Sequence, residues 1–197
     1  MKKPTNYDET QVSGDYIPVE LGGHILIIKS VEETQSKTGR EMIKIMFDFA
    51  ETDKQPGHFM SQFKNDIRPD KKWPHQATHY MLTKDAEGNC SRAFKAFTTS
   101  VERSNDGFKI AWGDAFCKCL KDKLVGGVFG MVEQEYQGEV KKRRELRWFR
   151  SVDGVLEADI PEDKLLADKP STPPSHPVGS DGFMNIPEGI DEELPFN

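Results

Sequence analysis

The sequence has little cysteine, no long apolar run and no nucleotide-hydrolysis motif. Its 197 residues include three cysteines, which are too few and too scattered for a disulfide framework. The aliphatic run Ile25–Ile28 is far too short to cross a bilayer, and no apolar segment follows the N-terminal lysines as in a secretory signal. The phosphate-loop pattern Gly-x-x-x-x-Gly-Lys-Ser/Thr is missing. We expect a cytoplasmic protein with reduced thiols and no membrane partner.

Residues that could bind a metal are sparse. His75 and His79 lie four positions apart, but the glutamate that follows the first histidine in zinc hydrolases is missing. Cys117 and Cys119 could complete a zinc site with them, although the Cys-x-x-Cys spacing of structural zinc sites does not occur. We predict no metal and no cofactor.

Apolar periodicity predicts a mainly β protein with one or two helices. Strands are expected over residues 16–31 and 41–49, where the second segment alternates strictly between apolar and polar residues. A short third strand is expected over 58–64. The spacing then becomes helical from Ser91 to near Asn105, and a second short helix is expected over 114–121.

Two runs rich in valine and aromatic residues, 124–136 and 139–152, flank Gln137-Gly138 and predict a hairpin. Residues 65–90 show no pattern that can be assigned. The order is therefore three strands, one or two helices and two strands. That order is typical of the five-stranded OB-fold barrel, which often binds oligonucleotides.

Composition divides the chain into four parts. Residues 1–13 are polar and are expected to form a flexible arm, and residues 14–166 are expected to form the OB-fold domain. Residues 167–182 contain a Pro/Ser/Gly-rich stretch typical of a linker. Residues 183–197 are acidic, and we expect them to be a disordered tail that binds partner proteins.

Charge is segregated along the chain. The total is −6, and residues 181–197 contribute −5 because they contain five acidic residues and no lysine or arginine. Residues 1–180 are therefore nearly neutral, at −1. Within them, residues 141–150 hold six basic residues and one acidic residue, a local charge of +5. The negative total argues against a nucleic-acid partner, but its distribution favours one.

The basic run places cations beside aromatic side chains. In an extended strand, Lys141, Arg143 and Arg147 share one face. Phe149 is expected on that face and Trp148 on the other. Cations track phosphates and rings stack on unpaired bases, at about 1–3 kcal/mol for each base. The alternative is a solvated edge strand protected by its charges. The residues predicted to bind single-stranded DNA are Lys37, Arg40, Lys44, Phe63, Lys64, Lys71, Lys72, Trp73, Tyr136, Lys141, Lys142, Arg143, Arg144, Arg147, Trp148 and Phe149.

The C-terminus resembles that of bacterial single-stranded DNA-binding proteins, whose acidic tip ends in a similar Asp-Asp-Asp-Ile-Pro-Phe. The matching residues are Asp191, Glu192, Glu193, Leu194, Pro195 and Phe196. More of the chain resembles such proteins from phages and mobile elements of Gram-positive bacteria, through Gly14-Asp15-Tyr16, Gly22-Gly23, Trp73, Phe94-Lys95-Ala96-Phe97 and Glu102-Arg103-Ser104-Asn105.

The resemblance implies that the barrel coats single-stranded DNA, with little sequence specificity, in the bacterial host cytoplasm. It also implies that the tail recruits host or phage enzymes of DNA replication, recombination and repair. One departure is Asn197, which follows Phe196 and so removes the terminal phenylalanine carboxylate from that contact. The expected protein is not an enzyme. A metal-dependent nuclease or recombination enzyme of a phage, and an adaptor that binds only proteins, remain alternatives, and homo-oligomerisation stays open.

Overall fold

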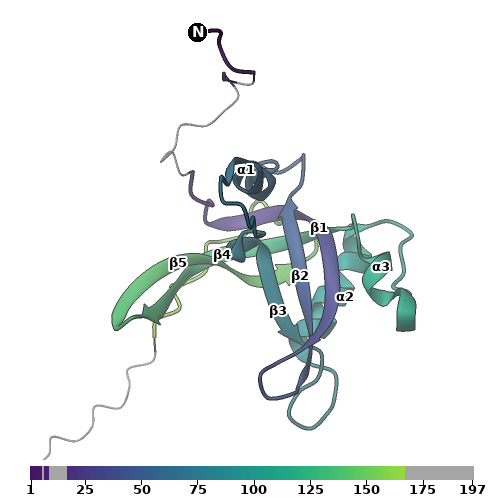
Figure 1. The fold of residues 1–197 in the computed structure, drawn as a ribbon. Helices are drawn as coiled ribbons and strands as arrows, with labels where there is room; N and C mark the ends of the chain where they lie inside the picture. Colours follow the sequence, from purple (N-terminus) through teal and green to yellow (C-terminus); the bar gives the residue numbers. More distant parts are fainter. Residues whose placement is uncertain (6, 9–16, 167–197) are drawn as a thin grey trace, which may run out of the picture. The chain divides into compact units, whose positions relative to one another are not determined.

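Figure 1 gives the fold of the chain in a computed structural model, which describes residues 1–5, 7–8 and 17–166. The expected linker and acidic tail lie outside the described residues. The described part is mainly β, with five antiparallel strands in one open sheet of order β3-β2-β1-β4-β5. The strands are β1 Gly22–Gln35, β2 Glu41–Phe49, β3 Thr78–Leu82, β4 Leu124–Tyr136 and β5 Glu139–Arg150.

Three short α-helices and two 3₁₀ turns connect the strands. No helix of the described residues is long and apolar enough to cross a membrane. The helices are α1 His58–Asn65, α2 Arg92–Ser104 and α3 Phe116–Cys119, and the 3₁₀ turns are η1 His75–Ala77 and η2 Gly113–Ala115.

The predicted alternation of the second strand is confirmed. Ile43, Ile45 and Phe47 are buried on one face of β2, and residues between them are partly exposed. Helix α2 is confirmed as well. Its Phe94 and Phe97 are buried at helical spacing, and each buried side chain of this size contributes about 1.5–3 kcal/mol. Both apolar faces belong to one core.

The prediction of a strand over 58–64 is wrong, because this segment is helix α1. Phe59 and Phe63 lie four residues apart, which puts both on one helical face. The carboxylate of Asp48, buried at the end of β2, accepts hydrogen bonds from the backbone N–H groups of Phe59 (2.9 Å) and Met60 (3.2 Å). These groups at a helix start have no partner within the helix. Asp48 therefore caps α1 from a strand.

The third strand of the sheet is β3, in the segment that the sequence left unassigned. It pairs with β2 from Met42–Leu82 to Met46–Thr78. β3 and the preceding turn η1 contact β5 through side chains: the His79 ring of β3 lies edge-on against Phe149 at 5.3 Å, and Gln76 Nε2 of η1 donates to the Arg144 carbonyl at 2.9 Å. No ladder between β3 and β5 occurs in the described residues, so the sheet stays open at this seam.

The β4–β5 hairpin extends beyond the rest of the sheet, as Figure 1 shows. Strand β1 pairs with β4 only from Leu124 to Phe129, whereas β5 pairs with β4 along its whole length. Its two-residue turn has positive φ at Gln137 (53°) and Gly138 (81°), which matches the twist that a tight hairpin requires. The predicted hairpin is confirmed, and its outer half is exposed.

A bulge in β5 changes the predicted faces of the basic run. The register shifts between the pairs Val128–Trp148 and Phe129–Leu146, so Arg147 is an extra residue. Because of this shift Leu146 and Phe149 are both buried, three positions apart, while Trp148 is exposed. The prediction that simple alternation continues to residue 149 is therefore wrong.

A buried polar pair fixes the start of β1. His24, fully buried, places Nδ1 2.9 Å from Asp53 Oδ1 and Nε2 3.0 Å from the Glu20 carbonyl oxygen. Both ring nitrogens of His24 therefore have an oxygen partner inside the protein. Asp53 also accepts from the backbone N–H groups of Ile25 (2.7 Å) and Gln55 (2.9 Å). Burial opposes the charge of Asp53, but these hydrogen bonds and the His24 charge lower its pKa.

Candidate nucleic-acid interface

The cations of β5 are of two kinds: some are paired with a carboxylate and some are not. Lys141 pairs with Glu139 at 3.0 Å, and Lys142 pairs with Asp163 at 2.8 Å. The hydrogen bond to Asp163 raises the pKa of Lys142. Arg143 and Arg150 are exposed and form no ion pair with a described residue. Their positive charge is available to a ligand.

Two further arginines of β5 hold the hairpin in place. Arg144 donates to the backbone carbonyl of Val19, and Arg147 donates to the carbonyls of Met131 (3.3 Å) and Glu162 (2.9 Å). Neither guanidinium group has a carboxylate partner in the part of the chain that the structure describes. The two residues therefore stabilise the fold and still contribute positive potential.

Aromatic rings lie beside these cations. Trp148 is 46% exposed with the Arg147 guanidinium 5.9 Å from its ring, and Tyr136 is 53% exposed with Lys141 Nζ 5.9 Å from its ring. Phe149, in contrast, is buried and packs against Phe97 at 4.8 Å. The rings that a base can reach are thus Trp148 and Tyr136.

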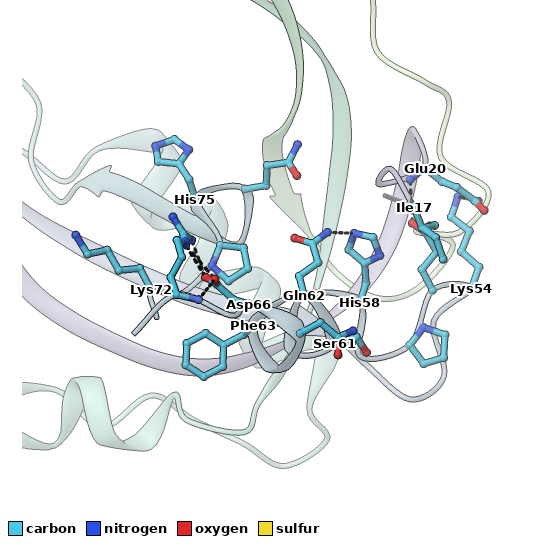
Figure 2. Close-up of a pocket in the computed structure, with 16 residues that line it drawn as sticks. Ile17, Glu20, Lys54, His58, Ser61, Gln62, Phe63, Asp66, Lys72 and His75 are labelled. Carbon is cyan, nitrogen blue, oxygen red and sulfur yellow. Dashed lines mark hydrogen bonds and ion pairs between the residues drawn. The ribbon is translucent and has the colours of Figure 1, made fainter. Parts of the chain in front are cut away.

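The second predicted cluster borders a pocket of 850 Å³, shown in Figure 2. Phe63 and Trp73 are half-buried and contact each other at 5.6 Å between ring centroids. Lys64, Lys71 and Lys72 make no ion pair with a described residue, and Lys72 lines the pocket. The structure therefore keeps this predicted group together.

Acidic side chains weaken the positive potential of this pocket. Arg68 forms a two-nitrogen contact with Asp66 (Nε–Oδ1 3.0 Å, Nη2–Oδ2 2.6 Å), which lowers the pKa of Asp66 to about 2. Across the pocket, Lys54 pairs with Glu20 at 3.3 Å. Of the pocket's cations, Lys72 is the one left without a carboxylate among the described residues.

The pocket also holds a neutral hydrogen-bonding pair. Figure 2 shows Gln62 facing His58, with 2.7 Å between their Nε2 atoms. Burial lowers the pKa of His58, and the Asp48 charge opposes this in part. With the amide nitrogen donating, the ring nitrogen accepts, as neutral imidazole does.

Gln76 joins the pocket to the hairpin. It lines the pocket and donates to the Arg144 carbonyl of β5, 68 residues away in sequence. The two basic clusters that the sequence placed far apart are therefore neighbours in the fold. No sequence signal marks Gln76, because its role depends on a contact between distant segments.

The remaining predicted cations lie at another end of the sheet. Lys37 and Arg40 belong to the β1–β2 turn, where Arg40 Nη2 donates to the Lys84 carbonyl at 3.3 Å. Lys44 pairs with Glu32 at 3.2 Å on the neighbouring strand. Figure 1 shows this turn and the hairpin pointing in different directions. The structure does not bring this group to the hairpin.

The described residues contain no grouping of three or more His, Cys, Asp or Glu side chains suited to a metal. His79 is instead packed on Phe149, where burial lowers its pKa, and Cys119 Sγ lies 3.1 Å from the Phe116 carbonyl. The predicted tail contacts lie outside the described residues; they are Asp191, Glu192, Glu193, Leu194, Pro195 and Phe196. No protein-family model matches the chain, and no curated protein matches it.

Proposed function

We propose that this protein is a non-catalytic binder that coats single-stranded DNA with little sequence preference. The observation that carries the proposal is the β4–β5 hairpin, where Arg143 and Arg150 have no carboxylate partner within residues 17–166 and the Trp148 and Tyr136 rings are exposed. Proteins that bind single strands without sequence preference combine cations along the backbone with rings that stack on bases. Both elements are present on this one hairpin.

The connectivity supports an OB-fold barrel as the architecture of the domain. Strand β1 pairs with both β2 and β4, and α2 lies between β3 and β4 in sequence. In the OB-fold, a partly open five-stranded barrel, the β1–β2 and β4–β5 loops flank the oligonucleotide-binding face. We propose that the seam of His79, Phe149 and Gln76 closes the barrel through side chains. The long hairpin then corresponds to the β4–β5 loop.

Partner recruitment is the second part of the proposal. The acidic residues of segment 183–197 would contact replication, recombination and repair proteins of a bacterial host or its phage, with the Phe196 ring in an apolar pocket. This part depends on the sequence resemblance, and places the protein in the bacterial cytoplasm. Because Asn197 follows Phe196, the contact would use the ring and the acidic side chains without a terminal phenylalanine carboxylate.

Salt-dependent binding tests the proposal. Fluorescence anisotropy with a labelled thymidine oligonucleotide and a matched duplex, from low to high salt, should give preferential binding to the single strand. The logarithm of the affinity should fall linearly with the logarithm of salt concentration, with a slope of about −0.7 for each phosphate contacted. No binding at low salt, or equal affinity for the duplex, would refute the proposal.

The same experiment separates the alternatives. Degradation of the labelled strand on addition of Mg²⁺ would identify a nuclease in place of a passive binder. Lys141→Gln/Arg143→Gln should weaken binding, because it removes two exposed cations from the hairpin. The matched control is Lys118→Gln/Lys121→Gln, which removes the same charge from an exposed surface around the end of α3. Equal effects of the two variants would move the binding site away from the hairpin.

A further inference from the structure

A second groove of strongly positive character lies between α2 and the end of β5. It has a volume of 650 Å³, and four of the residues that line it are cations. No Asp or Glu lines it, in contrast to the pocket beside α1, which contains Glu20 and Asp66. The four cations are Arg92, Lys95, Arg103 and Arg150.

These cations are free to contact an anion. All four are exposed, and none forms an ion pair with a described residue. The carboxylate nearest in sequence, Glu102, instead contacts the Ile110 N–H at 3.1 Å and Lys109 at 3.4 Å. Lys95 adds only a minor electrostatic contribution to the lowered pKa of Glu102, so no ion pair within the described residues neutralises the positive charge of the groove.

The shape of the groove follows from the helix. Arg92, Ala96, Thr99 and Arg103 repeat at spacings of four, three and four, which places them along one face of α2. Ala96 and Thr99 are short, so they leave a trough between the two arginines, and Phe149 contributes to its wall. Hydroxyl groups of Thr99 and Ser151 line the same trough and can donate to phosphate oxygens.

The length of the groove favours a polymer over a single ion. Arg92 and Arg103 are eleven residues apart, which is about 16 Å along a helix axis, or about five times the rise per nucleotide of B-form DNA. Successive phosphates of one strand can therefore contact the two ends separately. Arg150 belongs to this groove and to the basic strand β5, so the groove continues the surface that carries Trp148.

We propose that the α2–β5 groove is a second phosphate-binding track, which receives the backbone of a single strand where it leaves the hairpin. This inference rests on the proposed function. The groove supplies charge and hydroxyl groups, whereas the hairpin supplies the exposed rings. The strand is thus held by its phosphates at α2 and by phosphates and bases at β5.

The test compares two double variants in the full chain. Arg92→Gln/Arg103→Gln removes two groove cations while keeping helix propensity, since Arg and Gln are similar helix formers. Lys118→Gln/Lys121→Gln is the charge-matched control. With a long thymidine oligonucleotide, the salt slope of the groove variant should be smaller in magnitude by about 1.4, which corresponds to two phosphate contacts. The control should keep the wild-type slope, and urea unfolding should show that both variants are folded.

The outcomes are distinct. Suppose that the wild-type protein binds DNA, the hairpin variant Lys141→Gln/Arg143→Gln binds more weakly, and the groove variant keeps the wild-type salt slope. That result overturns the groove proposal and leaves the proposed function standing. Absence of binding by the wild-type protein refutes the proposed function itself, and the groove with it. A labelled peptide of residues 181–197 tests the other polyanion available. If the groove variant no longer binds that peptide but keeps the wild-type salt slope of DNA binding, the groove binds the acidic segment and the proposal is overturned.

Discussion

The charges buried near the start of β1 and the end of β2 differ from the cations exposed on β5 and α2 in how their hydrogen-bonding capacity is used. Asp53 accepts from three groups and Asp48 from the start of α1, and both carboxylates are buried. Arg143, Arg150 and Arg103 are exposed, with no carboxylate partner among the described residues. Burying a charge is costly unless it is paired, so the first group must be satisfied by the fold.

This difference separates stability from binding. A satisfied buried charge has no capacity left for a ligand, and its removal leaves donors unpaired inside the protein. An exposed unpaired cation contributes little to stability, because even surface ion pairs are worth about 0–1 kcal/mol. Substitutions in the first group should therefore change the free energy of unfolding, and those in the second should change affinity for DNA.

The largest effect is expected for Asp53→Ala. It leaves the ring nitrogen of His24 and two backbone N–H groups without their acceptor, and breaking a buried ion pair by removing one partner costs about 3–5 kcal/mol. Urea unfolding measures the loss. Asp53→Asn keeps the shape of the side chain but not its charge, so its free energy of unfolding should lie between those of the wild type and Asp53→Ala. This variant provides the measurement if Asp53→Ala does not fold.

The matched control for a surface pair is Glu41→Gln. Glu41 pairs with Lys84 at 2.8 Å, and both side chains are more than half exposed. Its removal should change the free energy of unfolding by about 0–1 kcal/mol. A loss at Glu41 as large as that at Asp53 would contradict the distinction between the two classes of charge.

Asp48→Ala should destabilise the protein by about 1–3 kcal/mol, because it removes the buried acceptor from the first turn of α1. Ser91→Ala is the comparison, since Ser91 accepts from the Phe94 N–H at 3.1 Å as an ordinary cap of α2. That change should cost about 1 kcal/mol. If urea unfolding shows a larger loss of stability for Ser91→Ala than for Asp48→Ala, the hydrogen bonds from Asp48 to α1 are not important for stability.

Trp148→Ala should weaken single-strand binding by about 1–3 kcal/mol, or roughly 5- to 150-fold, through loss of one stacked base. Trp112→Ala is the control: Trp112 is 66% exposed but stacks on Phe116 and belongs to the segment between α2 and α3, not to β4 or β5. Anisotropy titrations of both variants compare the two rings directly. An equal loss of affinity for Trp112→Ala would show that base stacking is not specific to Trp148.

How far the sequence predicted the structure depended on the range of the interactions. Local periodicity predicted β2, α2 and the hairpin, because alternation and helical spacing are visible in one segment. It failed at residues 58–64, where a carboxylate ten residues earlier in the chain caps a helix. The bulge at Arg147 was not predictable either, since register is fixed by pairing with β4 and by the buried Leu146 and Phe149.

The candidate site was predicted in the same uneven way. Composition identified the basic run, but it could not separate Arg143, which forms no ion pair with a described residue, from Arg147, which donates to two backbone carbonyls. The cations of α2 were hidden for a different reason. Arg92, Lys95 and Arg103 are exposed residues of an amphipathic helix, which usually face solvent, and they form a groove only because α2 packs beside Arg150.

Arg143→Gln and Arg147→Gln test that separation within one strand. Arg143→Gln should reduce the salt slope of binding by about 0.7 and leave the unfolding free energy unchanged, as expected for one lost phosphate contact. Arg147→Gln should lower the unfolding free energy by about 1–3 kcal/mol, because its hydrogen bonds fix the bulge to the segment containing Glu162. If Arg143→Gln lowers the free energy of unfolding and Arg147→Gln does not, the roles assigned to the two residues are wrong.

The smallest expected effect concerns His79, a half-buried titratable group that belongs to neither class of charge. Burial against Phe149 lowers its pKa in the folded protein, whereas the unfolded chain keeps a value near 6.5. Below pH 6.5 the unfolded chain therefore binds the proton first, and stability falls as the pH decreases toward the folded-state pKa.

His79→Gln should flatten this dependence between pH 8 and pH 5. His58, whose pKa burial also lowers, acts in the same direction, so part of the slope should remain. Urea unfolding at each pH measures it, with pH 8 as the reference at which neither folded nor unfolded histidine gains a proton. If His79→Gln keeps the full wild-type dependence of stability on pH, the seam between β3 and β5 does not exclude the charged ring of His79. The side-chain closure proposed for the barrel would then be wrong at this residue.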